Sequence, residues 1–434
     1  MNSLRIIDSE KITEETISSY IPRSMTQFDE IKSEIIDIIN QVKLNGDESI
    51  IKLSKKFDKV ELLKSDIKVK DEEIKEAYEK IETTLLEAIR TAKQNLIQFH
   101  EAQLREEWSI EIRKGVKAGQ VYRPLESIGI YIPGGRAIYP STVLMAITPA
   151  LVAGVKKMII CSPPQKDKKI APEILVAANE YGLKDIYKVG GAQAISAMAY
   201  GTETIPKVQK IVGPGNKWVN GSKQLLRDIV AIDNPAGPSE ILILADDSAP
   251  INYIILDFLS QIEHDPDNIG IIITPSNDLI DGIKKNIGIF IEESERKEII
   301  KEAIKKNSLI IKALDIDECI RVSNIIAPEH LQIMTKNPKE LLNRINNAGA
   351  IFLGSYSPVP LGDYSAGTNH ILPTGGNAKI YSGLNVFEFF KIIDVLECNK
   401  EGLQSIADSA MTIAEFEGLL GHKKSIEERL KDKN

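Results

Sequence analysis

The spacing of hydrophobic residues divides the chain into two kinds of region. In residues 27–44 and about 70–106, apolar side chains recur every three to four positions, which predicts long amphipathic helices. From Val121 onward, short apolar runs alternate with helical segments, the pattern of a parallel sheet covered by helices. A second series of this kind begins at Ile241 and continues to Gly354. The sequence therefore predicts an α/β protein with two units.

Two later stretches have a different character. Residues 354–385 are rich in Gly, Pro, Ser and Asn and have no extended helical or strand periodicity, which is typical of a functional loop and linker. The last fifty residues return to a helical pattern and predict a small C-terminal piece.

Composition narrows the class of protein. With 434 residues, 43% of them hydrophobic, the chain can bury more than one core. The net charge is −8, and both signs alternate along predicted helices such as 64–93, so we expect solvated faces and no nucleic-acid partner. Only three cysteines occur, without a CxxC pair, which favours a reducing cytoplasm. No apolar run reaches the roughly 18 residues of a membrane span, so neither export nor insertion is expected.

Three glycine clusters each follow a predicted strand and precede a helix. Ligands of open α/β sheets bind at the carboxyl ends of strands, where backbone N–H groups and helix N-termini favour phosphate. Glycine is also common in such turns simply because it adopts positive φ, so one cluster alone would say little. The dinucleotide fingerprint GxGxxG is absent, because Trp218 occupies its third glycine position. The clusters are Pro133-Gly134-Gly135, Gly190-Gly191 and Gly213-Pro214-Gly215.

Gln261 and His264 stand three residues apart in the last turn of a predicted helix over 251–264. Side chains at this spacing are neighbours, so the amide oxygen and an imidazole nitrogen could converge on one ion. The alternative is a polar helix border and a histidine that interacts favourably with the helix dipole.

Other polar residues lie in settings that suit catalysis. Glu329 and His330 precede a strand-like LQIM, where an acid–base pair can be displayed, although a surface pair is the alternative. Asp363 lies in a glycine-bounded loop, for which ordinary turn chemistry is the competing interpretation. In the tail, Glu417 and His422 either face a cleft or end a surface helix.

Four of these side chains form a possible ligand set for zinc or a similar divalent ion. They supply two nitrogens and two oxygens, and the weakly binding amide oxygen suggests an exchangeable position rather than a closed structural site. The set consists of Gln261, His264, Asp363 and His422.

Many ordered motifs carry a resemblance to a known family. From about residue 25 to 425 the chain contains IYIPGG, VGGAQAI, KIVGPGN, LSQIEHDPD, APEHLQI and GDYSAGTNHILPT, in that order. In these motifs it resembles the histidinol dehydrogenases. The resemblance implies that L-histidinol is oxidised through an aldehyde to L-histidine with water and two NAD. Alternatives are a related enzyme for another small polar alcohol, or a binding protein that has lost turnover.

The resemblance also assigns residue roles. It implies one zinc per subunit held by the four ligands named above, anchoring the substrate, with His330 taking the alcohol proton and Glu329 helping to activate water. Ser239 and Glu417 correspond to substrate-binding positions, together with the zinc ligands and the acid–base pair. The NAD contacts fall on Tyr131, Gln193 and Asn216. A cysteine nucleophile is the mechanistic alternative for the second oxidation.

The resemblance finally implies a fold and an assembly. It predicts two incomplete Rossmann-like domains with parallel sheets, plus small N- and C-terminal helical segments. We expect an arm over 1–25, a first domain with metal and acid–base residues over 26–130 and 240–384, and an NAD-binding domain over 131–239. The tail, 385–434, is expected to complete the site of the other subunit in a homodimer.

Overall fold

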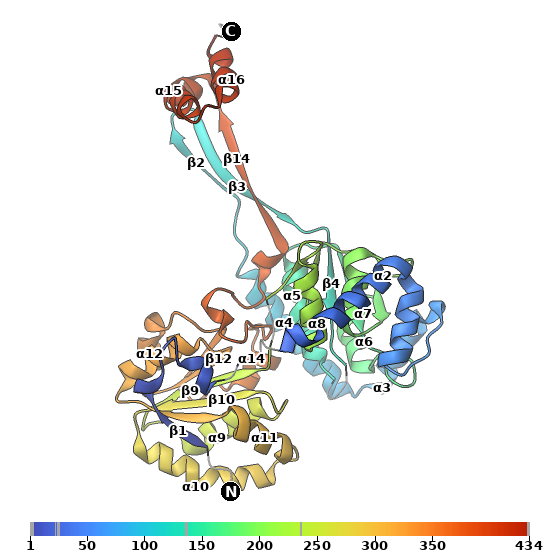
Figure 1. Ribbon diagram of the computed structural model, residues 1–434, viewed down its shortest axis with the longest axis vertical. Helices are drawn as coiled ribbons and strands as arrows, with labels where there is room; N and C mark the ends of the chain where they lie inside the picture. The colour runs from blue at the N-terminus through green and yellow to red at the C-terminus, as the bar shows by residue number, and fades with distance from the viewer. Residues whose placement is uncertain (1–3, 22, 24–26, 135–137, 235–236, 432–434) are drawn as a thin grey trace.

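The computed structural model describes residues 4–21, 23, 27–134, 138–234 and 237–431. Figure 1 shows two α/β lobes and an arm that projects from them. Each lobe contains its own parallel sheet, so the prediction of an α/β protein with two parallel-sheet units is confirmed. In the part of the chain described, no helix has the length and apolar character needed to cross a membrane.

The first lobe is built on a six-stranded sheet whose strands all pair in parallel. Its strands are almost continuously apolar because helices cover both faces. Helices α9 to α11 cover one face, and α12 with the N-terminal segment covers the other. The strands in spatial order are β1 (Arg5–Asp8), β11 (Leu309–Lys312), β10 (Ile269–Thr274), β9 (Glu240–Ala245), β12 (His330–Met334) and β13 (Ala350–Leu353). The helices are α9 (Ile251–Ile262), α10 (Asn277–Glu293), α11 (Lys297–Asn307) and α12 (Ile316–Ile326).

The second lobe has a five-stranded parallel sheet. Helices α3 to α6 pack on one face, and α2, α7 and α8 pack on the other. The strands in spatial order are β6 (Ile186–Lys188), β5 (Lys157–Ser162), β4 (Ser127–Tyr131), β7 (Lys210–Val212) and β8 (Ala231–Ile232). The helices are α2 (Gln27–Phe57), α3 (Asp71–Lys80), α4 (Thr83–Glu101), α5 (Pro140–Val152), α6 (Pro172–Asn179), α7 (Gly191–Tyr200) and α8 (Lys217–Leu226).

The N-terminal helices pack on a different lobe from the one we predicted. We grouped 26–130 with 240–384, whereas α2 packs on α7 and α8, α3 packs on α6, and α4 packs on α5. The buried face of α2, including Ile35 and Val42, joins the core of the five-stranded lobe. Helical periodicity shows that a helix has a face to bury, but it does not show which sheet receives that face.

The arm contains a sheet that the sequence analysis missed. Strands β2 (Trp108–Arg113), β3 (Val116–Pro124) and β14 (Phe390–Cys398) form an antiparallel sheet, and helices α15 (Lys400–Phe416) and α16 (Leu420–Leu430) lie at its far end (Figure 1). The tail that we predicted as helical therefore contains a nine-residue strand, which follows a short 3-10 helix over Val386–Phe389. Large apolar side chains on the arm remain exposed to solvent, among them Ile112, Leu396 and Phe416.

Residues 354–385 connect the first lobe to the arm. They are mostly irregular, as predicted, but include a short helix, α14 (Val359–Tyr364), that carries Asp363. Asp363 is therefore held on a helical turn instead of the open loop that we expected.

Candidate active site

The acid–base residues lie at the amino end of the central strands of the six-stranded sheet. Glu329 precedes β12 and His330 is its first residue, and both side chains are buried. The adjacent strand, β9, begins with Glu240, which is also buried. Parallel alignment of β9 and β12 brings these three residues to the same edge of the sheet.

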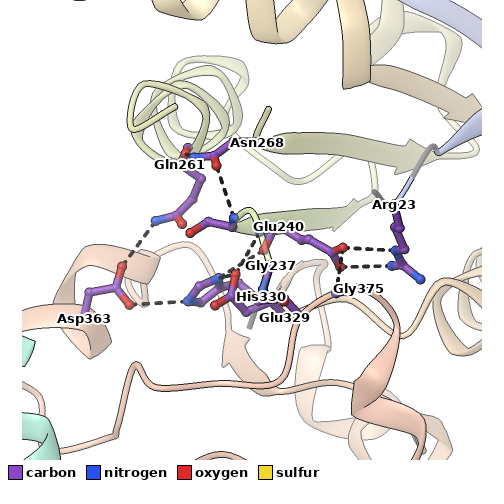
Figure 2. Close-up of polar contacts among 11 residues, drawn as sticks. Arg23, Gly237, Glu240, Gln261, Asn268, Glu329, His330, Asp363 and Gly375 are labelled. Carbon is purple, nitrogen blue, oxygen red and sulfur yellow. Dashed lines mark hydrogen bonds and ion pairs between the residues drawn. The ribbon is translucent and has the colours of Figure 1, made fainter. Parts of the chain in front are cut away.

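The backbone of Glu240 holds both members of the pair (Figure 2). Its N–H donates to Glu329 Oε2 at 2.8 Å, and its carbonyl oxygen lies 3.0 Å from His330 Nδ1. A carbonyl oxygen only accepts hydrogen bonds, so Nδ1 carries the hydrogen. Nε2 is then the atom of neutral His330 that can take a proton. It is buried and lacks a hydrogen-bond partner, with Asp363 Oδ1 3.4 Å away.

A buried ion pair fixes Glu240 itself. The Arg23 guanidinium donates through Nε and Nη2 to the two oxygens of the Glu240 carboxylate, at 3.0 and 2.9 Å. The N–H of Gly375 adds a third hydrogen bond at 3.0 Å. The fork of two parallel bonds restricts the carboxylate in direction as well as distance. Arg23 and Gly375 therefore stabilise the strand end on which the acid–base pair depends.

The environment shifts the pKa of both acid–base groups. Burial raises the pKa of Glu329, and its neighbour His330 only partly opposes the shift. Burial alone would lower the pKa of His330, but the carboxylates of Glu329 and Asp363 outweigh burial and raise it. The upward shift brings the pKa of the Glu329 carboxyl group closer to neutral pH, and it makes the His330 imidazole a stronger base.

Three of the four predicted zinc ligands come together beside His330. Gln261 Nε2 donates to Asp363 Oδ2 at 3.3 Å, which leaves the amide oxygen of Gln261 available (Figure 2). The Asp363 carboxylate is close enough to His264 to affect its pKa, although burial dominates and lowers that pKa. Helix α9 ends at Ile262, so His264 lies in the following bend and not in the last turn as predicted. Pro266 disfavours helical conformation in Asp265, so the helix could not have continued past His264.

These donors suit a zinc ion in their chemistry. An amide oxygen, an imidazole held neutral by burial and a carboxylate are all oxygen or nitrogen ligands that zinc accepts. Burial alone would raise the pKa of Asp363, but His330, together with His370 and Gln261, outweighs burial and lowers the pKa, which favours the carboxylate form. Among the residues that the structure describes, no three His, Cys, Asp or Glu side chains are grouped to hold a metal.

The fourth predicted ligand lies elsewhere in the chain. His422, on α16, and Glu417, which follows α15, are both exposed. Both helices lie at the end of the arm, remote from β12 and α14 (Figure 1). Within one subunit the structure therefore separates these two residues from the other site residues.

Two side chains that the sequence analysis did not assign connect the parts of the site. Asn268 donates to the Gln261 carbonyl at 2.8 Å and accepts from the Ser239 N–H at 3.1 Å, so it joins the end of α9 to the start of β9. His370 Nδ1 lies 2.8 Å from the Asp363 carbonyl, and its Nε2 lies 3.3 Å from Thr142 Oγ1. His370 thereby links the Asp363 segment to the first turn of α5 in the other lobe.

The three predicted NAD contacts line one cavity of about 870 Å³ in the five-stranded lobe. Tyr131 Oη accepts the N–H of Gly191 at 3.1 Å, and Asn216 caps α8 by accepting the N–H groups of Trp218 and Val219. Gln193 lines the same cavity from α7. The volume is within the range of cofactor sites.

Two of the three glycine turns contribute glycines to the wall of this cavity. Gly134 and Gly191 line it directly, while Gly135 lies outside the described residues. Gly213 has φ 113°, and a Cβ atom there would lie 2.2 Å from the carbonyl oxygen of Tyr131. Only glycine fits this close approach of two strand ends.

No cysteine adjoins the acid–base pair. Cys161 is buried in β5, where burial raises the pKa of its thiol. Cys319 is buried in α12, and burial raises its pKa to about 12. Cys398 is exposed at the end of β14. Because the nucleophilic form is the thiolate, the two buried cysteines are unsuited to covalent catalysis.

Two parallel sheets, a cofactor-sized cavity at glycine turns and a buried acid–base pair define an α/β dehydrogenase. The chain belongs to the histidinol dehydrogenase family, whose model matches residues 21–430. It is 49% identical to the histidinol dehydrogenase of Methanocaldococcus jannaschii over 422 residues, 97% of each chain. A crystal structure of histidinol dehydrogenase from Elizabethkingia anophelis is similar with a TM-score of 0.94 and 38% identity, covering 99% of this chain and 98% of that one. The family resemblance seen in the sequence is confirmed.

Proposed function

We propose that the protein oxidises L-histidinol through L-histidinal to L-histidine, with two NAD and one water, as a cytoplasmic enzyme of histidine biosynthesis. The observation that carries this proposal is the Glu329–His330 pair, held by Glu240 and facing Asp363 and Gln261. Another small polar alcohol remains the alternative substrate. Comparison of turnover between histidinol and unrelated alcohols distinguishes the two.

His330 acts as the general base of the first oxidation in this proposal. Its Nδ1 donates to the Glu240 carbonyl, so the lone pair of neutral Nε2 points away from the backbone and accepts the alcohol proton. Bound NAD supplies the hydride acceptor for both oxidations.

Glu329 serves the second oxidation, which needs water. As a carboxylate it accepts the proton of the water that adds to the aldehyde carbon. Its raised pKa, which burial causes, makes it a stronger base than an exposed glutamate. The Glu240 N–H holds one of its oxygens, so the other is left to meet water.

Gln261, His264 and Asp363 would hold zinc, with His422 of a second subunit. When bound, zinc supplies a Lewis-acidic anchor for the nitrogen atoms of the substrate. The proposed substrate positions Ser239 and Glu417 extend the site on either side of this anchor, Ser239 from the strand end and Glu417 from the arm.

A homodimer with shared sites accounts for the arm. Its apolar side chains, such as Ile112 and Leu396, are 60% and 68% exposed, an unusual arrangement for residues that a second subunit does not cover. Glu417 and His422 lie on the same arm, and both are exposed in one subunit. Docking of the arm on another copy would bury the apolar surface and supply these two residues together.

Purified protein given L-histidinol and excess NAD is expected to form two NADH for each histidine. The reason is that one acid–base pair serves both steps, so the aldehyde is oxidised where it forms. Absorbance of NADH and chromatographic measurement of histidine check the ratio. One NADH with accumulated aldehyde contradicts the two-step proposal, and equal rates with unrelated alcohols contradict the substrate.

Removal of zinc is expected to abolish turnover, and added zinc is expected to restore it. Loss of a residue that only hydrogen-bonds to a metal ligand typically lowers metal affinity by roughly 10- to 100-fold. Asp363→Asn removes a proposed ligand itself, so it should weaken zinc binding by at least this factor. Elemental analysis of the dialysed protein measures bound metal independently of activity. Full turnover in metal-free protein would rule out the ligand set.

A further inference from the structure

Asp58 is a carboxylate on the wall of the cavity that holds Tyr131, Gln193 and Asn216. It follows α2 directly, and its backbone N–H donates to the Ser54 carbonyl at 2.9 Å, so the helix end fixes its position. Its Oδ2 atom is buried and has no hydrogen-bond partner. Because Asp58 is half-buried and lines the cavity, a hydrogen-bond donor that enters the cavity can reach this carboxylate.

The surroundings keep Asp58 available for such a ligand. Burial raises its pKa to about 6, and the nearby Ser54 hydroxyl, which makes no close hydrogen bond of its own, only partly opposes this shift. The group is therefore mainly ionised at neutral pH and accepts hydrogen bonds only. Of the charged residues lining the cavity, Asp167 is acidic and Lys166 is basic, and both are exposed. The cavity wall thus carries the Asp58 carboxylate and no excess of positively charged side chains.

The chemistry of the cavity indicates which part of a dinucleotide meets Asp58. A carboxylate accepts two neighbouring hydroxyls well, and a ribose offers this pair at C2′ and C3′. The nicotinamide end has to reach His330, which lies in the other lobe. That lobe contacts the first turn of α5 through His370, which lies between Thr142 and the Asp363 carbonyl. Asp58 instead follows the end of α2, next to Phe57. The exposed ring of Phe57 also lines the cavity and offers a base an apolar surface.

We propose that Asp58 binds the 2′- and 3′-hydroxyls of the adenosine ribose and makes the enzyme select NAD over NADP. The proposal rests on the proposed function, in which this cavity holds the dinucleotide. A 2′-phosphate would remove the hydroxyl donor and bring two negative charges to an acidic wall. Asp58 is thus a specificity-determining residue on a segment far from the glycine turns in sequence.

Direct binding of nucleotides to the full-length protein without alcohol tests this role. Calorimetry with the wild type should give a Kd for an NAD analogue lacking the adenosine 2′-hydroxyl that is about 10-fold or more above the Kd for NAD. Asp58→Asn should raise the Kd for NAD by about 10- to 100-fold, the effect of losing hydrogen bonds to a charged group. The same substitution should leave the Kd for the 2′-deoxy analogue nearly unchanged. It should also bring the Kd for NADP closer to the Kd for NAD.

Glu61→Gln is the matched control, since it removes a nearby negative charge that is exposed and paired with Lys55 outside the cavity. It should leave the preference for NAD unchanged. Wild-type protein that binds NAD and the 2′-deoxy analogue equally well would overturn the role of Asp58, even if a variant failed to fold. Unchanged discrimination in folded Asp58→Asn would also overturn it and leave the proposed function intact. Wild-type protein that binds no NAD would instead reject the proposed function.

Discussion

His330→Asn is expected to lower kcat for histidinol oxidation by about 10²- to 10⁴-fold, the usual contribution of a positioned general base. Asparagine retains a group that can donate to the Glu240 carbonyl, so the strand end should stay folded. Asparagine lacks the Nε2 lone pair that would accept the alcohol proton. Stopped-flow measurement of the first NADH against the second separates the two oxidations, and calorimetry with NAD checks that the cofactor cavity is intact.

The pH profile distinguishes a base from a structural residue. A base works only when neutral, so kcat/KM should rise with pH as His330 loses its proton. The neighbouring carboxylates raise the pKa of His330 and so shift this rise toward higher pH. The rise should disappear in His330→Asn. Glu329→Gln should slow the second oxidation more than the first, because only the second consumes water. Equal losses in both steps, or an unchanged pH profile, would contradict these assignments.

Most strands of both parallel sheets could be predicted because parallel strands covered on both faces are continuous apolar runs, whereas the short edge strands β1 and β8 were missed. ILILA and IGIIIT, for example, are fully buried as β9 and β10. Strand β14 was missed for the opposite reason. Its side chains are mostly exposed, and its partner β3 lies more than 250 residues earlier, without a hairpin turn to signal the pairing. The sheet on which α2 packs was predicted wrongly, because the hydrophobic periodicity of the helix is compatible with either sheet.

For the candidate site, the sequence indicated the site residues themselves better than it indicated the residues that hold them in position. Tyr131, Gln193 and Asn216 stood next to glycine turns, and the structure brings all three to one cavity. Glu240 carried a signal that was not used, because it is a lone acidic residue at the head of an apolar strand. Its partner Arg23 is 217 residues away in sequence, and no local pattern predicts such a pair.

Mixing two inactive variants is expected to restore activity if the arm of one subunit completes the site of the other. His330→Asn damages a residue in the lobe, and His422→Asn damages one on the arm. Each homodimer then carries the same defect in both sites and should lose most of its turnover. In a mixed dimer, one site carries both defects and the other carries neither.

Statistical reassociation gives mixed dimers in about half of all pairs, so roughly a quarter of wild-type activity should return. The measurement is NADH formation after joint refolding or co-expression with different affinity tags. The matched control mixes His330→Asn with Asp363→Asn, both in the lobe, where every site keeps one defect and no activity should return. Full activity of His422→Asn alone would remove the arm from the site. Two inactive variants that stay inactive when mixed would place His422 in the site of its own subunit, because only sharing between subunits can separate the two defects.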